Sequence, residues 1–294
     1  MSAIATTSDD CQQALQHYEN FPVASLLLPR PLRAAVKVLY RFARSADDIA
    51  DEGNLPAAER LRQLDNYAEQ LSLIEAGCPS RQPLFQQLAI VVQQHHLSCS
   101  LLHDLLDAFR QDVLQQRYTS HIELRDYCRR SANPVGRLLL QLFNSTTPRH
   151  FAPHHFEWSD AICTSLQLIN HWQDVAIDMA KQPSRLYLPR QELERHGVSE
   201  AQIAAGICDD RWRTLMRDEV DRARTLMLSG APLGRALPGR IGLELRLIIQ
   251  GGLRILVKIE AVDYDIFRRR PTVQRHDLPV LLWRALTMRA NDVA

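Results

Sequence analysis

Two pairs of aspartates with the same spacing are the residues of this chain best suited to chemistry. Asp47 and Asp51 lie four residues apart, and so do Asp174 and Asp178. On an α-helix, residues four apart share a face, so each pair presents two carboxylates in one direction. Like charges placed in this way repel, and a bound cation removes the repulsion. Mg²⁺ prefers such oxygen ligands and is often completed by substrate phosphates, which predicts a magnesium-dependent reaction.

A single pair would be weak evidence, because acidic residues are common on solvated helix faces. Both pairs here follow a largely apolar helical segment, over residues 32–46 and 162–170. This context favours carboxylates that point into a cavity. Gln167 and Asn170 precede Asp174 at helical spacing, and both could bind metal water or a phosphate oxygen.

The composition is that of a cytoplasmic enzyme. The chain has 294 residues, a net charge of +1 and 46% hydrophobic residues, enough to bury a large core. The balanced charge gives no indication of a nucleic-acid partner. The six cysteines show no CxxC spacing, which favours reduced thiols over disulfides or zinc.

Residues 243–262 are the most membrane-like segment, but five charged residues interrupt them, so a core helix is expected there. Peripheral contact with the inner face of a membrane stays open in case the substrate is a lipid. The histidines are expected in surface or capping roles, since no carboxylate joins them at metal-site spacing. The histidines considered are His95, His96, His103, His154 and His155.

Helical patterns run along the whole chain. Segments rich in Leu, Ala, Gln, Arg and Glu alternate with Gly and Pro, which predicts about ten helices joined by short turns. No repeat or linker divides them, so residues 1–294 are expected to form a single all-α domain. Residues 1–16 are expected to be a flexible N-terminus, and residues 277–289 a final helix on the outside.

Several ordered motifs give the chain a family resemblance. Besides the aspartate pairs, these are Tyr127-Cys128 followed by Val135-Gly136, and the RLYLP sequence at residues 185–189. Together they resemble the squalene/phytoene synthase family over about residues 17–270. The resemblance implies an isoprenoid synthase fold, with its helices around a central cavity, and a prenyl diphosphate substrate.

Within that family, residues 19–25, 40–53, 127–137 and 170–178 resemble the branch that makes hydroxysqualene in hopanoid pathways. The resemblance implies a lyase that ionises presqualene diphosphate, rearranges the cation and lets water capture it. Such an enzyme is expected to work beside a presqualene diphosphate synthase and a hydroxysqualene-processing enzyme. Water capture needs no redox cofactor, so Mg²⁺ is the one cofactor expected.

The resemblance also implies a set of site residues. The expected metal ligands are Asp47, Asp51, Asn170, Asp174 and Asp178. The four aspartates and Tyr127 are the expected catalytic residues. The expected substrate contacts are Arg44, Phe21, Ser131, Asn133, Val135, Gly136, Gln167, Arg185, Tyr187 and Arg269. An intrahelical ion pair remains an alternative for Arg44, and a solvated basic run remains one for Arg269.

A break in one helix is predicted at the sequence SANPVG. Pro134 removes a backbone donor and Gly136 lacks a side chain, so a helix over about residues 122–143 should kink and expose backbone to a channel for a prenyl chain. A kink buried in the core is the alternative. The residues expected to line the channel are Tyr127, Ser131, Val135 and Leu138.

Two other functions stay open beside the hydroxysqualene branch. A head-to-head prenyltransferase, joining two farnesyl or geranylgeranyl diphosphates to presqualene diphosphate, squalene or phytoene, shares most of the motifs. A non-catalytic assembly factor would have no use for four carboxylates that destabilise one another without metal. Ser131 and Asn133 favour the first function, because polar side chains beside a cation channel can hold the capturing water.

Overall fold

The computed structural model describes residues 29–53, 55–78, 80–146 and 151–288 of the chain. These residues form ten α-helices of ten or more residues (α2–α8, α11, α13 and α14), three shorter ones (α9, α10 and α12) and one 3-10 helix. The extended pairing among them is one parallel bridge between Arg117 and Leu186. The predicted all-α class is confirmed. Residues 1–16 and Phe21 lie outside the described residues.

The helices follow one another along the chain with short connections. The first half contains α2 (Arg30–Asp51), α3 (Ala57–Glu75), α4 (Pro83–His95), α5 (Cys99–Leu114), α6 (His121–Ser131) and α7 (Asn133–Thr146). The second half contains α8 (Pro153–Ala180), α9 (Arg190–His196), α10 (Glu200–Ala204), α11 (Asp210–Gly230), α12 (Leu233–Ala236), α13 (Gly239–Ala261), η1 (Arg275–Asp277) and α14 (Leu278–Thr287).

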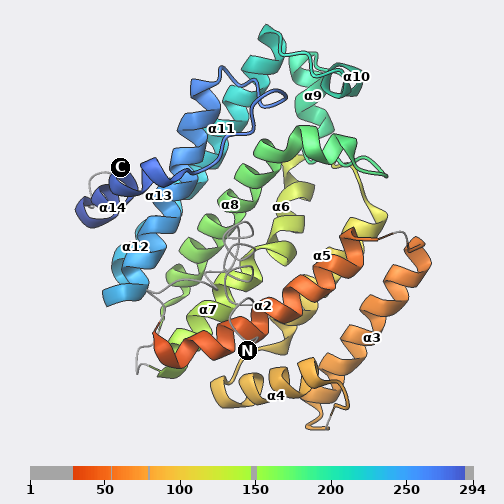
Figure 1. The fold of residues 1–294 in the computed structure, drawn as a ribbon, viewed down its shortest axis with the longest axis vertical. Helices are drawn as coiled ribbons and strands as arrows, with labels where there is room; N and C mark the ends of the chain where they lie inside the picture. The colour runs from red at the N-terminus through yellow and green to blue at the C-terminus, as the bar shows by residue number, and fades with distance from the viewer. Residues whose placement is uncertain (1–28, 54, 79, 147–150, 289–294) are drawn as a thin grey trace, which may run out of the picture.

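Helix α8 is the centre of the arrangement. It packs against α6, α7, α11 and α13, and Figure 1 shows it running through the middle of the molecule. Helix α2 packs against α3, α4, α5 and α7. Buried apolar side chains from Leu32 to Met288 form one contiguous core. The two helices that carry the aspartate pairs are therefore both built into this core.

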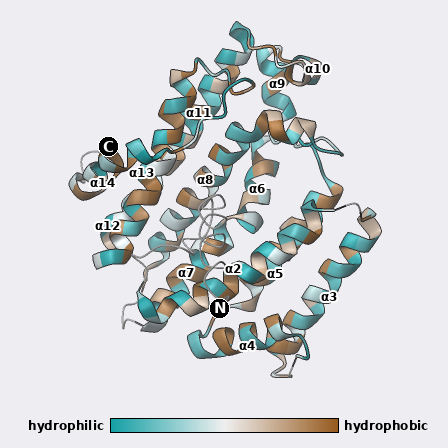
Figure 2. Cartoon of the chain, viewed as in Figure 1, coloured by the Kyte–Doolittle hydropathy of each residue, from teal (hydrophilic) through white to brown (hydrophobic). Residues whose placement is uncertain are grey.

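The sequence of α2 explains why its aspartates lie where they do. The helix begins directly after Pro29, and Pro31 is tolerated in its first turn because the missing N–H would have no helical partner there. Its buried residues recur at helical spacing from Leu32 to Ala50, and Figure 2 shows apolar and polar residues interleaved along such helices. The buried stripe fixes the rotation of the helix, and Asp47 and Asp51 follow at its end.

The predicted helix break is present between α6 and α7. Ala132 is the junction residue, and α7 begins with Asn133 and Pro134. Gly136 lies against α8, where an added Cβ would come within 2.3 Å of Ser159 Oγ and 2.7 Å of Cys163 Sγ. The missing side chain therefore allows close helix packing. The predicted contact of Gly136 with a prenyl chain stays a prediction.

The C-terminal helices agree with the sequence. Residues 243–262 lie almost entirely within α13, whose Ile249, Leu256 and Ile259 are buried. No helix in the described part of the chain has the length and apolar character needed to cross a membrane. Helix α14 packs on α13 and leaves much of its own surface exposed, including Trp283. It is the outer helix that was expected.

Candidate active site

The two aspartate pairs lie at the C-terminal ends of α2 and α8, and basic side chains bring them together. Asp51 is the last residue of α2, and α8 ends two residues after Asp178. Lys181 Nζ lies 2.9 Å from Asp178 Oδ1 and 3.6 Å from Asp51 Oδ2. One ammonium group thus contacts both pairs, which the sequence separates by more than a hundred residues.

Arg185 adds a second connection from the segment after α8. Its Nη1 donates to Asp51 Oδ1 at 2.6 Å, and its Nη2 donates to the backbone oxygen of Asp112 in α5 at 3.1 Å. The backbone of this segment is held by the bridge between Arg117 and Leu186, where Leu186 N donates to Gln116 O at 3.0 Å. The predicted loop guanidinium therefore lies against the first aspartate pair.

The remaining two aspartates have arginine partners of their own. Arg270 contacts Asp174 through two nitrogens, with Nη2 3.1 Å from Oδ2. Arg44 Nη1 lies 3.4 Å from Asp47 Oδ2, and Arg44 also pairs with Glu52 at 2.6 Å. The intrahelical ion pair that was the alternative for Arg44 is thus present, and its contact with substrate stays a prediction.

The basic residue at the second pair differs from the predicted one. Arg269 was expected to contact the substrate. Both Arg269 and Arg270 are exposed, and it is Arg270 whose side chain reaches Asp174. The segment between Phe267 and Pro271 has no helical repeat from which the direction of each arginine can be deduced. We therefore add Arg270 as a candidate phosphate-binding residue, and the substrate contact of Arg269 stays a prediction.

The electrostatics of the site favour a bound cation. Both pairs lie at helix C-termini, where the helix dipole opposes negative charge. Loss of solvation and then repulsion from Asp51 raise the pKa of Asp47 to about 7. Burial likewise raises the pKa of Asp178, although Lys181 counteracts it. A set of carboxylate oxygens whose ionisation is suppressed in this way fits Mg²⁺, which would restore the charged forms.

A buried carboxylate in α5 organises the aromatic residues beside these charges. Tyr127 donates its hydroxyl to Asp112 Oδ2 at 2.9 Å, and Tyr187 donates to Asp112 Oδ1 at 3.3 Å. Burial raises the pKa of Asp112 to about 7, against the opposing effect of Arg185. Tyr127 therefore has a fixed hydroxyl, and its predicted catalytic role remains a prediction.

The rings next to Asp112 form a stack. His171 lies on Tyr187 with ring centroids 3.6 Å apart and an interplanar angle of 9°, and Tyr118 and Tyr127 contact Tyr187. Burial lowers the pKa of His171 to about 3, so its ring is neutral at ordinary pH. Neutral aromatic faces attract cations.

Among the other predicted residues, two carry buried polar atoms without a partner. Gln167 Oε1 and Ser131 Oγ are both buried and make no hydrogen bond. Such groups are rare in folded proteins unless water or a ligand satisfies them. Asn133, by contrast, accepts a hydrogen bond from Thr164 Oγ1 at 2.9 Å and so joins α7 to α8. Asn170 is half-buried.

The apolar lining residues lie in the protein interior. Val135 is buried near the start of α7, and Leu138 is buried one turn further along. Their side chains belong to the same contiguous core as Tyr127. Their contact with a prenyl chain stays a prediction.

Sequence reasoning missed Asp112, Lys181, Arg270 and His171. For Asp112 a signal existed, because it follows Leu105 and Phe109 at helical spacing on the buried face of α5, and an acidic residue in an apolar stripe is unusual. For Lys181 a signal also existed, because it lies three residues after Asp178, whereas Arg270 reaches Asp174 from an irregular segment that offers none.

The histidine expectations hold in part. His155 accepts from the backbone N–H of Ala152 at the start of α8, which is the expected capping role. His95 is buried and contacts Ser145 Oγ at 2.7 Å, so the expectation of a surface position was wrong for it. Its position near the C-terminal end of α4 faces α7, where the serine offers a partner.

Comparison with known proteins gives the class to which the fold and site belong. The squalene/phytoene synthase model matches residues 14–277, and the chain belongs to this family. Enzymes of the family act on prenyl diphosphates. The resemblance seen in the sequence motifs is confirmed.

Individual relatives carry different activities. A hydroxysqualene synthase of Zymomonas mobilis is 33% identical over 233 residues, which cover 78% of this chain and 75% of that protein. A phytoene synthase of Arthrospira platensis is 30% identical over 285 residues, which cover 93% and 91%. The crystal structure of a squalene synthase from Alicyclobacillus acidocaldarius is 36% identical, with a TM-score of 0.76, over 87% of this chain and 94% of that one. The predicted isoprenoid synthase fold is confirmed. Because the similar proteins include hydroxysqualene, phytoene and squalene synthases, similarity alone does not assign the branch.

Proposed function

We propose that this protein converts presqualene diphosphate and water into hydroxysqualene and diphosphate. The observation that carries the proposal is the convergence of the two carboxylate pairs with Lys181 and Arg185. Ser131 follows Tyr127 by one helical turn, and its buried hydroxyl without a partner supports a place for the capturing water. Similarity to the hydroxysqualene synthase of Zymomonas mobilis supports the same branch.

The reaction begins with cleavage of the C–O bond, whose electron pair leaves on the diphosphate. Lys181 and Arg185 are placed to neutralise that developing charge, and the planar guanidinium suits phosphate oxygens. Bound Mg²⁺ would supply Lewis-acid stabilisation of the same anion. Its proposed ligands are Asp47, Asp51, Asn170, Asp174 and Asp178.

After ionisation, the cyclopropylcarbinyl cation rearranges and water adds to the product cation. The adding water loses one proton, so the reaction consumes one water and needs no redox cofactor. The neutral stack of His171, Tyr187 and Tyr127 can stabilise positive charge without competing for it. A presqualene diphosphate synthase would supply the substrate, and an enzyme that removes the hydroxyl group would consume the product.

A prenyltransferase that joins two prenyl diphosphates is the second candidate. It is favoured by the phytoene synthase of Arthrospira platensis, whose similarity extends over more of the chain than that of the hydroxysqualene synthase. In a non-catalytic assembly factor, the burial of Asp47 and Asp178 and their repulsion by neighbouring carboxylates would lower the stability of the protein and serve no function.

Product analysis tests the proposal. Purified protein with Mg²⁺ and no NADPH would receive farnesyl diphosphate in one sample and presqualene diphosphate in another, with products identified by mass spectrometry. Hydroxysqualene from the second sample alone is the expected result. Presqualene diphosphate from the farnesyl sample, or phytoene from a third sample with geranylgeranyl diphosphate, would establish the prenyltransferase. No product in any of the three samples would support the non-catalytic function.

Two variants test the site independently of the branch. Asp51→Asn and Asp174→Asn remove one ligand from each pair, and each should lower turnover by at least roughly a hundredfold. The helical circular-dichroism spectrum should not change, because both residues lie near the ends of their helices. Activity that survives both changes would show that the metal ligands are elsewhere.

A further inference from the structure

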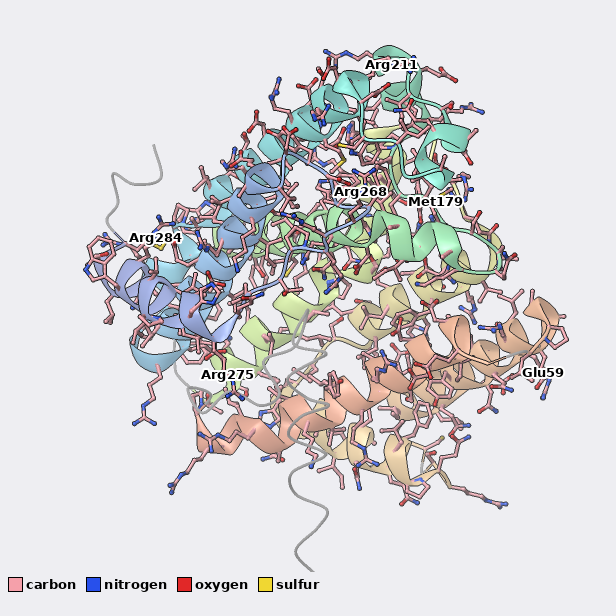
Figure 3. The ribbon with its side chains drawn as sticks, turned by 45° about the horizontal axis from the view of Figure 1, so that its top comes forward. Glu59, Met179, Arg211, Arg268, Arg275 and Arg284 are labelled. Atoms are coloured by element: carbon pink, nitrogen blue, oxygen red, sulfur yellow. The ribbon has the colours of Figure 1, made fainter. Side chains whose placement is uncertain are left out.

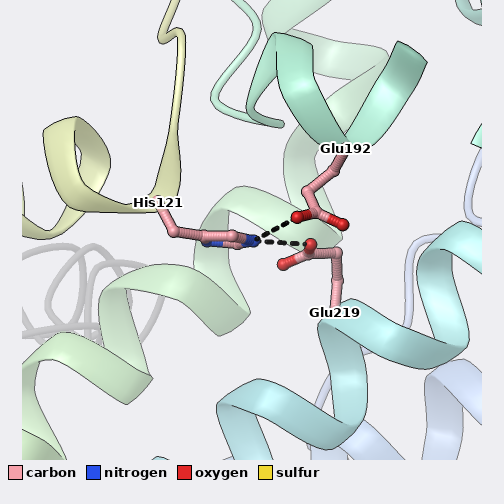
Figure 4. Close-up of side chains that lie close together, drawn as sticks. All are labelled: His121, Glu192 and Glu219. Atoms are coloured by element: carbon pink, nitrogen blue, oxygen red, sulfur yellow. Dashed lines mark hydrogen bonds and ion pairs between the residues drawn. The ribbon is translucent and has the colours of Figure 1, made fainter. Parts of the chain in front are cut away.

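A second group of potential metal ligands lies where three helices meet, away from the aspartate pairs. His121 is the first residue of α6, Glu192 lies in α9 and Glu219 lies in α11. One ligand atom from each lies within 4.8 Å of the other two, and Figure 4 shows the side chains converging. His121 Nε2 is 3.0 Å from Glu219 Oε1 and 3.8 Å from Glu192 Oε1.

The burial of Glu219 distinguishes this group from an ordinary surface ion pair. Its side chain is 0% exposed, and its second oxygen, Oε2, has no hydrogen-bond partner. The nearest cation to that oxygen is Arg222, whose Nε lies 3.9 Å away, beyond hydrogen-bond distance. A fully buried carboxylate needs strong compensation, and one histidine contact supplies only part of it.

A second histidine, His196, lies near the other carboxylate oxygen of Glu192. His196 lies in the same helix, with Nε2 3.8 Å from Glu192 Oε2, and its side chain is only 9% exposed. That nitrogen is also buried without a hydrogen-bond partner. Its shortest ionic contact is with Asp218 Oδ2 at 3.3 Å, so His196 borders the group of three converging residues and is not a member of it.

We propose that His121, Glu192 and Glu219 bind a divalent transition-metal ion of the Zn²⁺ type. Imidazole nitrogen combined with carboxylate oxygen suits Zn²⁺, whereas Mg²⁺ prefers oxygen alone. Ligands about 2.0–2.2 Å from a tetrahedral ion lie roughly 3.3–3.6 Å apart. The separations from His121 Nε2 bracket that value, so small side-chain rotations suffice.

The position of the ion gives it a structural role. Backbone hydrogen bonds join the first two residues of α9 to the segment just before α6, from Arg190 N to Tyr118 O at 2.9 Å and from Gln191 N to Thr119 O at 3.1 Å. The segment before α9 carries Arg185, and Glu192 of the proposed metal site is the third residue of α9. The ion would therefore hold α9, and with it the C-terminal end of the segment that carries Arg185, against α11.

Equilibrium dialysis of the full-length protein tests the proposal. Chelator-treated protein would be dialysed against Zn²⁺ with excess Mg²⁺ to fill the aspartate site, and bound zinc measured by mass spectrometry. One zinc per chain is expected. Glu192→Gln and His121→Gln should each weaken binding by at least about tenfold. His103→Gln is the matched control, because His103 lies 3.6 Å from Glu75 in a pair without the third ligand.

Two outcomes would overturn the proposal. Wild-type protein that binds no stoichiometric zinc would do so, and so would unchanged affinity in both ligand variants. If a variant fails to fold, the wild-type protein with Co²⁺ still decides the question. A tetrahedral site of nitrogen and oxygen ligands gives intense visible ligand-field bands, and their absence would exclude it.

Discussion

At the scale of residues, basic side chains offset the repulsion between the neighbouring aspartates. Each aspartate of the two pairs has a basic partner. Arg44 and Lys181 lie three residues from Asp47 and Asp178, whereas Arg185 and Arg270 come from distant segments that local spacing could not predict. The spacing of Asp47 and Asp51 is a property of one helix, so it was readable in the sequence. The choice of Arg270 over Arg269 depends on the course of an irregular segment, which has no period.

The adjacent arginines provide a matched pair of variants. Arg270→Ala should lower kcat/KM for the prenyl diphosphate by roughly tenfold to a hundredfold, since a hydrogen bond to a charged group contributes about 1.5–3 kcal/mol. Arg269→Ala removes the same charge one residue away and should leave kcat/KM within about twofold. Steady-state kinetics of both variants decide the matter, and the reverse order would make Arg269 the contact residue.

Asp112 should make the stability of the protein depend on pH. Its pKa is about 7 in the folded protein and near 3.8 when exposed, so its stabilising contribution is complete below about pH 4 and is lost as the pH rises through 7. The free energy of unfolding should therefore fall between pH 5 and pH 8, and fall less in Asp112→Asn. Urea unfolding with chelator present measures this.

Asp126→Asn is the control for that experiment. Its carboxyl pairs with Arg129 and Arg130, and these hydrogen bonds lower its pKa, so it stays ionised from pH 5 to pH 8. The variant should keep the wild-type pH profile. An identical profile for Asp112→Asn would show that Asp112 does not titrate in this range.

At the scale of elements, Ser131 and Asn133 lie on either side of the break between α6 and α7, although the sequence predicted the same role for both. Asn133 is engaged with Thr164 across to α8, while Ser131 at the end of α6 keeps an unsatisfied hydroxyl. The break itself was predictable from Pro134. Which of the two side chains is free to hold water depends on the packing of α8, and the sequence contains no measure of that.

Ser131→Ala should change the product more than the rate. Loss of the hydroxyl should lower the share of hydroxysqualene and raise that of hydrocarbon formed by proton loss, with total turnover nearly kept. Ser165→Ala is the control, because its buried hydroxyl already donates to Ala223 O. Product ratios from mass spectrometry test the prediction, and equal ratios in the two variants would contradict it.

Elements also explain why the group around His121 escaped sequence reasoning. Its three residues come from α6, α9 and α11, and no motif spaces them along the chain. The histidines that attracted attention were those adjacent in sequence, such as His95 and His96. Long-range convergence of this kind follows from helix packing alone.

At the scale of the whole molecule, α14 presents an apolar surface that fits contact with a membrane. Leu278, Leu282 and Leu286 follow at four-residue spacing and are exposed, together with Trp283. The exposed Arg275 and Arg284 accompany them, and Figure 3 places Arg284 at the opposite edge of the molecule from Glu59. We propose an anionic bilayer surface as the occupant of this face, because apolar and basic side chains together suit it.

Vesicle co-sedimentation tests this surface. Leu286→Glu should reduce binding to vesicles of phosphatidylglycerol and phosphatidylcholine, because it places a carboxylate on the apolar face. Ile90→Glu makes the same change at a residue that is equally exposed, 63% in each case, but lies on α4. Equal binding by both variants, or none by the wild type, would remove α14 from the membrane surface.

The pairing of acids with bases at the candidate active site has a thermodynamic consequence. Arg185 is paired with Asp51, and Arg270 with Asp174. When a diphosphate binds together with Mg²⁺, the diphosphate replaces the aspartates as partner of the arginines, and Mg²⁺ replaces the arginines as partner of the aspartates. Binding is then an ion exchange in which few small ions are released to the solvent. The affinity for substrate should accordingly respond only weakly to ionic strength, unlike that of a site with bare, uncompensated charge.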